Sequence, residues 1–270
     1  MSQPTVDAAQ DTLVGYEARD GVAYMTLSDP PANTYTHEMM CQLDGAILQA
    51  RFDVDVHVIV LTGLGEKFFC AGANIDMLQT ADPTFKYYFC LHANETLSRL
   101  EQTPKLVIAA LNGHTVGGGL EIAMAADLRI AKKDAGKLGL PEVNLGVLPG
   151  TGGTQRLARM IGKARSIELM VTGSLVSFEE GQQMGCVNQI FEGDDFADQV
   201  HAYATQFCPP NSAAKAVGRI KRSVQSGVEV PLESGLAMER ELQQQLFQSG
   251  DAGEGLNAYV EKRKPEFKGS

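Results

Sequence analysis

Cysteine is scarce in this chain of 270 residues, which contains five. The five are odd in number, lie far apart in the sequence and include no CxxC pair. Neither a disulfide framework nor a zinc knuckle is therefore indicated. Reduced thiols fit a cytoplasmic protein, and this is the compartment that we expect.

The chain also lacks a long hydrophobic run and a basic leader. Its apolar runs, such as residues 107–111, are far too short to cross a bilayer. Residues 1–14 carry Asp7 and Asp11, no arginine and no apolar centre, so we expect neither a secretory signal nor a transit peptide. The net charge is −10 and no basic stripe is visible. We therefore expect no nucleic-acid partner and no membrane partner.

Several common catalytic motifs are missing. There is no GxxxxGK[ST] phosphate loop, no GxSxG nucleophile elbow and no HExxH zinc motif. The Gly63-x-Gly65 turn lacks the third glycine of a dinucleotide fingerprint. The five histidines (His37, His57, His92, His114 and His201) are scattered, so the sequence predicts no metal site.

What is present is the composition of a globular protein, with 44% hydrophobic and 21% charged residues. Short branched runs predict strands at 22–27, 56–61, 106–111, 127–131 and 187–191. Helical spacing of apolar residues predicts helices at 37–51, 84–101, 117–126, 155–161, 163–171, 178–184, 194–207, 212–225, 232–248 and 252–262. The pattern indicates an α/β core over residues 1–195 and a helical extension over residues 196–270.

Three glycine-rich segments are the strongest functional signal. They are residues 68–76 (FFCAGANID), 112–121 (NGHTVGGGLE) and 138–153 (LGLPEVNLGVLPGTGG). The first two follow predicted strands, and the second opens a helix. Glycines at 117–119 let the backbone approach a ligand, and free N–H groups at a helix start stabilise negative charge on an oxygen. Such donors are what an oxyanion hole requires.

Two glutamates belong to these segments. Glu121 falls in the first turn of the predicted helix, and Glu142 follows Pro141 in a predicted loop. Two carboxyl groups that converge on one site share a proton near neutrality, which suits general acid/base catalysis. The alternative is that each is a solvated surface residue. Gly150, Gly152 and Gly153 are expected to shape the turn before the next helix, and Cys70 is expected to be a buried filler.

Taken in order, these segments resemble the crotonase superfamily, the enoyl-CoA hydratase/isomerase family. The resemblance runs from DPPANT at 29–34 through AGANI at 71–75, GGGLEIA at 117–123 and LPEVNLGVLPGTGGTQRL at 140–157 to EKRKPEF at 261–267. It implies an α/β spiral of ββα units with a C-terminal helical trimerisation region. It also implies a homo-oligomer, either a trimer or a hexamer made of two trimers.

The resemblance further implies roles for particular residues. The backbone N–H groups of Ala73 and Gly118 would hold a thioester oxygen, and Glu121 and Glu142 would be the acid/base pair. Asn74 departs from the family, which often has Asp there. Lys262 is a candidate for the CoA phosphates, the alternative being a solvated lysine. The candidate contacts for substrate and CoA are Ala71, Ala73, Asn74, Ile75, Met77, Gly117, Gly118, Leu140 and Lys262.

The family's hydratases carry glutamate at the positions that match Glu121 and Glu142. The resemblance therefore favours an enoyl-CoA hydratase, as in fatty-acid β-oxidation. The expected substrate is an acyl-CoA, and no separate cofactor is expected because CoA is part of the substrate. Glu142 would give a proton to the α-carbon and Glu121 would orient the water, although this division between the two stays open. The alternatives are an enoyl-CoA isomerase, a hydratase for branched or cyclic acyl-CoA, or a non-catalytic acyl-CoA-binding paralogue.

Overall fold

The computed structural model describes residues 12–270 and contains two β-sheets. From β3 to β8, successive strands along the chain belong to the two sheets in turn. The expectation about a leader rests largely on residues 1–11, which lie outside the described residues. The larger sheet has six strands in the order β1-β2-β3-β5-β7-β10. These are β1 (Val14–Arg19), β2 (Val22–Leu27), β3 (Val58–Gly63), β5 (Leu106–Leu111), β7 (Leu128–Lys132) and β10 (Gln189–Phe191). β1 pairs with β2 antiparallel, and every other pair in this sheet is parallel.

The smaller sheet has four short strands in the order β4-β6-β8-β9. They are β4 (Phe68–Cys70), β6 (His114–Val116), β8 (Lys137–Gly139) and β9 (Val176–Ser177). β4, β6 and β8 are parallel to one another, and each follows a strand of the larger sheet and precedes a helix. This repeated strand–strand–helix order is the spiral of ββα units that the family resemblance implies.

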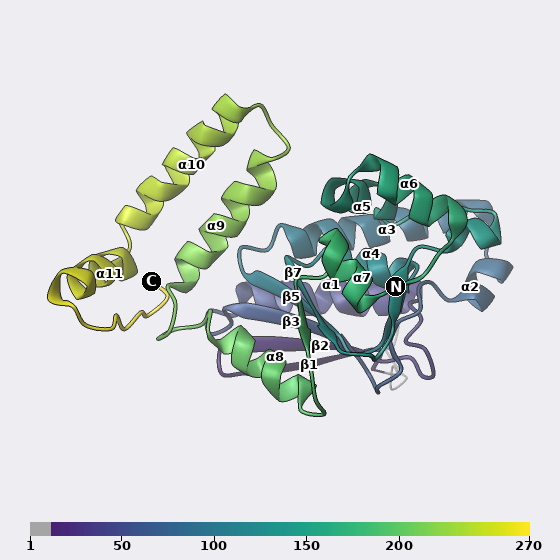
Figure 1. Cartoon of the computed structure of the whole chain (residues 1–270), viewed down its shortest axis with the longest axis horizontal. Helices are drawn as coiled ribbons and strands as arrows, with labels where there is room; N and C mark the ends of the chain where they lie inside the picture. The colour runs from purple at the N-terminus through teal and green to yellow at the C-terminus, as the bar shows by residue number, and fades with distance from the viewer. Residues whose placement is uncertain (1–11) are drawn as a thin grey trace, which may run out of the picture.

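Helices cover both faces of the larger sheet (Figure 1). Those of the core are α1 (His37–Phe52), α2 (Ile75–Thr80), α3 (Pro83–Glu101), α4 (Gly118–Met124), the 3₁₀ helix η1 (Glu142–Leu145), α5 (Gly153–Ile161), α6 (Lys163–Thr172) and α7 (Phe178–Met184). They are followed by α8 (Phe196–Thr205), α9 (Ala214–Gly227), α10 (Leu232–Phe247) and α11 (Gly250–Glu261).

The hydrophobic core is split by the larger sheet, because side chains alternate along each strand. Ile59 and Leu61 of β3 face a cluster that includes the inner sides of α1, α3 and α4. Val58 and Val60 of the same strand face the other cluster, to which α8 contributes. The predicted boundary at residue 195 falls between β10 and α8. Because α8 packs against the sheet, the helices that extend away from the core in Figure 1 are α9, α10 and α11.

Two buried asparagines fix the crossings between the sheets. The Asn112 side chain donates to the carbonyls of Gly63 (2.9 Å) and Gly65 (2.6 Å) and accepts from the N–H of Gly63 (3.1 Å). The Asn33 side chain donates to the carbonyl of Phe68 (2.9 Å). A Cβ on Gly63 would overlap the backbone of Phe69, so only glycine permits this close crossing. The segment after β4 is thereby held in a defined position.

The long helices and strands that the sequence predicts are confirmed. Most of the elements that it does not predict are short. The structure has helices at all ten predicted places, with ends that differ by up to two residues. β3 begins and ends two residues later than the predicted strand at 56–61. The sequence does not predict β1, α2 or the strands of the smaller sheet. Strands of two or three residues are too short to display a periodic pattern, and they form because the ββα spiral aligns them.

A buried ion pair joins α9 to the core. The Nζ of Lys221 lies 2.8 Å from Oδ2 of Asp127 and also donates to the carbonyl of Lys105 (3.0 Å). Both charged side chains are largely buried. None of the helices formed by residues 12–270 combines the length and apolar character that a bilayer crossing requires.

Replacing Lys221 by alanine is expected to lower the free energy of unfolding by about 3–5 kcal/mol, because it leaves the Asp127 carboxylate buried without its counter-charge. Chemical denaturation measures this difference. Lys215→Ala is the control, since Lys215 is an exposed lysine on the same helix and its loss is expected to change stability by less than about 0.5 kcal/mol. Equal effects from the two substitutions would contradict the prediction.

Candidate active site

The segments after β4, β6 and β8 meet at one end of the smaller sheet. A Cβ built on Gly72 would lie 3.1 Å from the nitrogen of Gly118, so the first two segments are in close contact. The N–H of Gly117 donates to the carbonyl of Gly139 (2.9 Å), which holds the third segment beside them. A Cβ on Gly117 would lie 3.1 Å from Oε1 of Glu142. The three glycine-rich segments therefore lie together and form one site.

Two backbone N–H groups at this site are available to a ligand. Those of Ala73 and Gly118 have no acceptor within residues 12–270. The residues on either side of Ala73 are bound to Tyr35, whose N–H donates to the carbonyl of Gly72 (2.9 Å) and whose carbonyl accepts from Asn74 (2.9 Å). The Tyr35 ring lies against Gly118, where a Cβ would overlap it. This packing holds the two free donors in place.

Glu121 is a buried side chain at this site. It occupies the first turn of α4 and is 2% exposed. Its Oε1 accepts from the backbone N–H groups of Thr151 (2.7 Å) and Gly153 (2.6 Å). Burial raises the pKa of Glu121, and the two N–H groups and the positive charge of Arg156 offset part of that effect.

Glu142 faces the same space from η1. Burial raises its pKa to about 7; its own backbone N–H opposes the shift, and the negative charge of Glu121 adds to it. A Cβ on Gly153 would lie 2.9 Å from Oε1 of Glu121, and one on Gly117 would lie 3.1 Å from Oε1 of Glu142, so both carboxyl groups border the glycine-rich segments of the site. Oε2 of Glu142 is buried and has no hydrogen-bond partner in the described part of the chain. A buried carboxyl oxygen without a partner is costly, so this atom is suited to a ligand.

The loop that holds Glu121 is braced by residues that the sequence pattern does not single out. Arg156 makes two hydrogen bonds to Glu101 (2.9 and 2.6 Å) and a third to the carbonyl of Thr151 (3.1 Å). The hydroxyl groups of Tyr35 and Thr151 are 3.2 Å apart. Residues 150–153 thus do more than shape a turn, because two of their N–H groups bind Glu121. The TGGTQR run was the available signal, since its glycines leave those N–H groups accessible.

The structure places the other predicted residues as follows. Leu140 is buried; its Cδ1 would lie 3.0 Å from a Cβ on Gly153, a position that is also 2.9 Å from Oε1 of Glu121. Asn74 caps α2, where its side chain accepts from the N–H of Met77 (2.9 Å). An asparagine performs this capping as an aspartate would, so the departure from the family leaves the turn intact. Ile75 is exposed and Met77 is partly buried against the core.

Lys262 is not brought to this site by its own chain. It ends α11, and Figure 1 shows α11 and α2 at opposite ends of the molecule. A groove of about 980 Å³ is also elsewhere: it lies between α9 and the core and is bordered by Met160, Ile220 and Val224. We place the chemistry at the carboxyl pair, because the groove contains no pair of converging carboxyl groups next to free N–H donors.

The pair predicts a bell-shaped pH dependence of kcat/KM. Catalysis by two carboxyl groups that share one proton should decline above about pH 7, where the raised pKa of Glu142 means that the shared proton is lost. It should also decline at acidic pH, where both groups are protonated. Initial rates at pH values from about 5 to 9 test this, and a rate unchanged above pH 7 would contradict it.

Comparisons with known proteins agree with this geometry. The family model described as enoyl-CoA hydratase/isomerase matches residues 17–270. The chain is 35% identical to the short-chain-enoyl-CoA hydratase of Clostridium acetobutylicum, over 93% of this chain and 95% of that protein. It is 38% identical to the (E)-benzylidenesuccinyl-CoA hydratase of Thauera aromatica, over 95% and 99% respectively. The crystal structure of the protein described as "Enoyl-CoA hydrates" from Geobacillus kaustophilus HTA426 superposes with a TM-score of 0.94 at 44% identity, covering 97% of this chain and 98% of that one.

Proposed function

The chain belongs to the enoyl-CoA hydratase/isomerase family, and on that premise we propose that it catalyses the reversible addition of water to a 2-enoyl-CoA, giving a 3-hydroxyacyl-CoA. The observation that carries the proposal is the pair of Glu121 and Glu142 beside two unbound N–H groups. An isomerase needs to move one proton between carbons, whereas hydration needs one group for the water and one for the α-carbon. Two carboxyl groups facing one space supply both.

The proposed mechanism begins with the thioester carbonyl. Its oxygen accepts hydrogen bonds from the N–H groups of Ala73 and Gly118, which polarises the conjugated double bond and stabilises the enolate-like transition state. A water molecule is held by the two carboxyl groups. Its oxygen bonds to C3 as its proton passes to Glu121, and the α-carbon takes a proton from Glu142. The pair then regains its starting state by transfer of one proton from Glu121 to Glu142.

The surroundings of the pair support this division of roles. Glu121 has an oxygen fixed by two backbone N–H groups, so it is well placed to hold a water in one orientation. Glu142 has a pKa raised to about 7, so it carries a proton to donate near neutrality. These groups and the N–H donors supply the acid, the base and the oxyanion site. We therefore propose that the reaction needs no resident cofactor, CoA being part of the substrate.

We propose that the acyl-CoA extends from this centre along α2. Ala71, Ala73 and Ile75 would border the adenine side, and the exposure of Ile75 leaves its apolar side chain free to contact a ring. Asn74 would shape that turn through its cap on α2. Gly117 and Leu140 would border the reacting carbons, and Met77 would contact the acyl chain.

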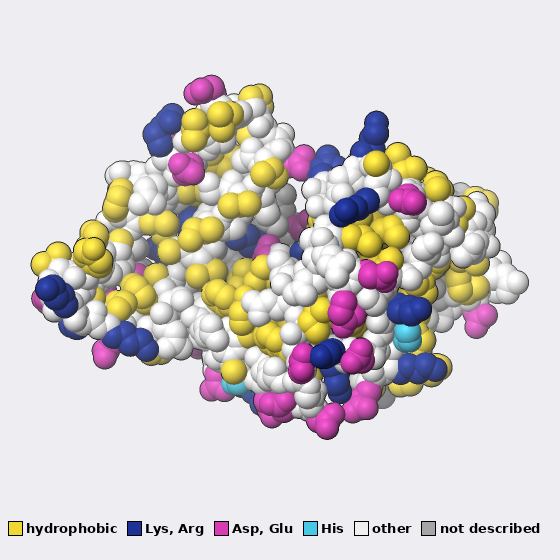
Figure 2. All heavy atoms as spheres, viewed as in Figure 1, with side chains coloured by type: hydrophobic (Ala, Val, Ile, Leu, Met, Phe, Trp, Pro, Cys, Tyr) yellow, Lys and Arg dark blue, Asp and Glu magenta, His cyan; other side chains and the backbone are white. Residues whose placement is uncertain are grey.

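We also propose that the chain forms a homo-oligomer, a trimer or a hexamer, through its C-terminal helices. α10 has no buried residue, and Leu232 and Phe247 on it are more than half exposed. Figure 2 shows hydrophobic side chains spread over α9, α10 and α11. Such a surface is typical of a subunit interface. In an oligomer, Lys262 of one copy could reach the CoA phosphates bound to another, and sedimentation of the purified chain measures the state.

The proposed compartment is the cytoplasm. All five cysteines are free thiols, and three of them (Cys70, Cys186 and Cys208) are buried. Unpaired buried thiols are compatible with a reducing environment.

Crotonyl-CoA is the substrate that tests the proposal. Loss of the conjugated enoyl-thioester absorbance, with a product heavier by one water, is the expected result. A product of unchanged mass with a shifted double bond would instead identify an isomerase. No reaction with crotonyl-CoA or with longer, branched and cyclic enoyl-CoAs, combined with tight binding of them, would identify a non-catalytic paralogue. The named substrates of the relatives differ, so this panel also finds the preferred acyl group.

A further inference from the structure

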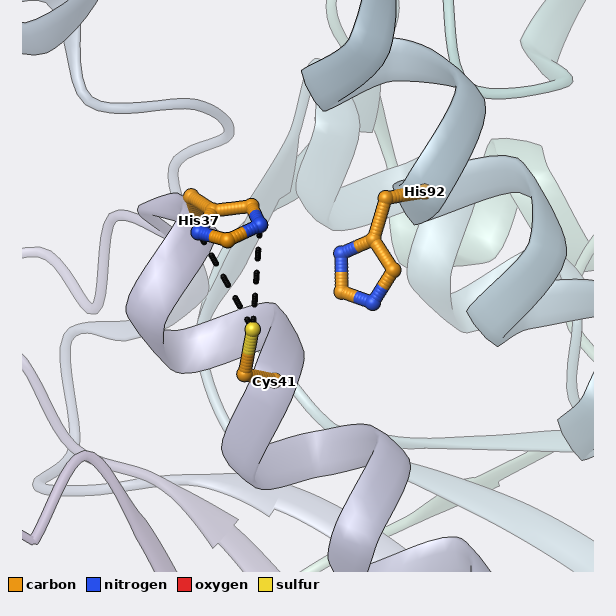
Figure 3. A group of neighbouring side chains, drawn as sticks. All are labelled: His37, Cys41 and His92. Atoms are coloured by element: carbon orange, nitrogen blue, oxygen red, sulfur yellow. Dashed lines mark hydrogen bonds between the residues drawn. The ribbon is translucent and has the colours of Figure 1, made fainter. Parts of the chain in front are cut away.

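Away from the carboxyl pair, three side chains with metal-binding atoms converge on the surface between α1 and α3. His37 and Cys41 are four residues apart on α1, a spacing that puts both on one face of a helix. His92 points toward them from α3 (Figure 3). One ligand atom from each lies within 4.8 Å of the other two. The sequence predicts no ligand cluster, because His92 is far from the other two along the chain and only the packing of α3 against α1 brings it near.

The distances suit a tetrahedral metal ion. Sγ of Cys41 lies 3.7 Å from Nε2 of His37 and 3.9 Å from Nδ1 of the same ring. Zinc bonds of about 2.3 Å to sulfur and about 2.0–2.1 Å to nitrogen, at tetrahedral angles, place the two ligand atoms about 3.6 Å apart. The His37 and His92 ring centres are 5.2 Å apart with the planes tilted by 53°. The ligand atom of His92 lies within 4.8 Å of the other two, and rotation of the side chains would bring it closer.

The donor set determines which cation fits. Two imidazole nitrogens and one thiolate sulfur favour a borderline-soft ion over Mg²⁺ or Ca²⁺, which prefer oxygen. We propose that His37, Cys41 and His92 bind a divalent cation of the Zn²⁺ type, with the fourth position open to water. Nothing in the hydration chemistry uses these three residues, so this site is distinct from the carboxyl pair.

Two further observations favour a cation here. Nδ1 of His92 is buried without a hydrogen-bond partner among the described residues. A metal ion bound to this nitrogen would give it a partner. The negative charges of Glu38 and Asp44 act on Cys41, where they add to burial in raising the pKa of the thiol. That same negative potential attracts a cation, although Asp44 is partly neutralised by Arg99 at 2.7 Å. Binding would displace the thiol proton and form a thiolate.

The expected consequence is mechanical. A bound ion would tie the first turn of α1 to the middle of α3, in addition to their apolar packing and the ion pair between Asp44 and Arg99. Because the ligands come together only in the folded chain, binding should stabilise the fold.

The test is a titration of the metal-free, full-length protein with Zn²⁺ alone, monitored by calorimetry and by the thermal unfolding midpoint. We expect one Zn²⁺ per chain with a micromolar or lower dissociation constant and a raised Tm. Cys41→Ser and His92→Ala should each weaken binding by at least about tenfold and abolish the Tm increase. Cys90→Ser, which removes a different thiol from α3, should bind as the wild type does.

Substitution of Co²⁺ for Zn²⁺ gives an independent readout. The wild type and Cys90→Ser should show an absorption band from thiolate-to-cobalt charge transfer, and Cys41→Ser should not. Absence of stoichiometric Zn²⁺ binding by the wild type would overturn the proposal. Equal Zn²⁺ affinity of the wild type and Cys41→Ser would also overturn it. Neither result depends on the hydratase activity.

Discussion

Replacing Glu142 by glutamine should slow the hydration of crotonyl-CoA by about 10²- to 10⁴-fold, the range for loss of a general acid or base. The amide has nearly the same shape as the carboxyl group but cannot supply the proton that the α-carbon needs. The raised pKa of about 7 is what lets the wild-type group carry that proton near neutrality. The decrease should appear in kcat, because the missing transfer occurs after binding. Steady-state kinetics over a range of crotonyl-CoA concentrations measures it.

Glu179→Gln is the matched control. Glu179 lies on α7, is also half-buried and also has one buried oxygen without a partner in the described part of the chain, but it is outside the site. Its replacement should leave kcat within about twofold of the wild-type value, as for a substitution remote from the chemistry. A Glu142→Gln enzyme that is as fast as Glu179→Gln would contradict the assignment of Glu142.

The folding stability of Glu142→Gln should depend on pH in a defined direction. The pKa of Glu142 is raised in the folded protein from 4.5 to about 7, so its ionisation opposes folding. Below about pH 4.5 this loss of folding stability is absent, because Glu142 is protonated in both the folded and the unfolded state. Above about pH 7 the loss is complete. Glutamine does not ionise. The variant should therefore unfold at a higher Tm than the wild type above pH 7 and at an equal Tm near pH 4.5.

Replacing Gly72 by alanine should lower kcat by about 10²- to 10³-fold, the effect of removing one oxyanion donor. The new methyl group would lie 3.1 Å from the nitrogen of Gly118, in the space beside one of the two free N–H groups. A substrate oxygen could then no longer approach that donor closely. Single-turnover rates with crotonyl-CoA at saturating enzyme would show the loss in the chemical step.

Backbone strain is the competing explanation, since Gly72 has a φ of +97° that alanine adopts poorly. Gly185→Ala separates the two effects. Gly185 has a φ of +87°, but a Cβ there would meet nothing within 4 Å. Both variants should lose a similar amount of stability, about 1–2 kcal/mol, whereas only Gly72→Ala should lose activity. A comparable loss of kcat in the two would mean that strain, and not blockage of the donor, was responsible.

The carboxyl pair was predictable because its signals are local. Three consecutive glycines before Glu121 indicate a helix start that a ligand can approach, and Pro141 before Glu142 indicates a fixed turn. The strands of the larger sheet that lead into these segments, such as β3 and β5, are long and apolar enough to be found by pattern, whereas the short strands whose ends carry the site are not. The positions of both glutamates follow from those facts together with the family resemblance.

Other parts of the site depend on contacts between distant residues. The hydrogen bonds from Arg156 to Glu101 and from Thr151 to Glu121 span 55 and 30 positions. No local spacing encodes such pairs. The same holds for His92 beside Cys41 and for the short strands of the smaller sheet, whose two or three residues gain their conformation from neighbours. These features follow from the assembled spiral.

The central claim is that Glu121 and Glu142 act as one unit on a single water molecule. It is tested most directly by kcat/KM for crotonyl-CoA in the wild type, Glu121→Gln, Glu142→Gln and the double variant. Residues that act as a unit have strongly non-additive effects, because the loss of either already disables the shared step. We predict that the double variant is no more than about tenfold slower than the slower single variant. If the two effects multiply in full, the carboxyl groups act independently and the account of a shared water is wrong.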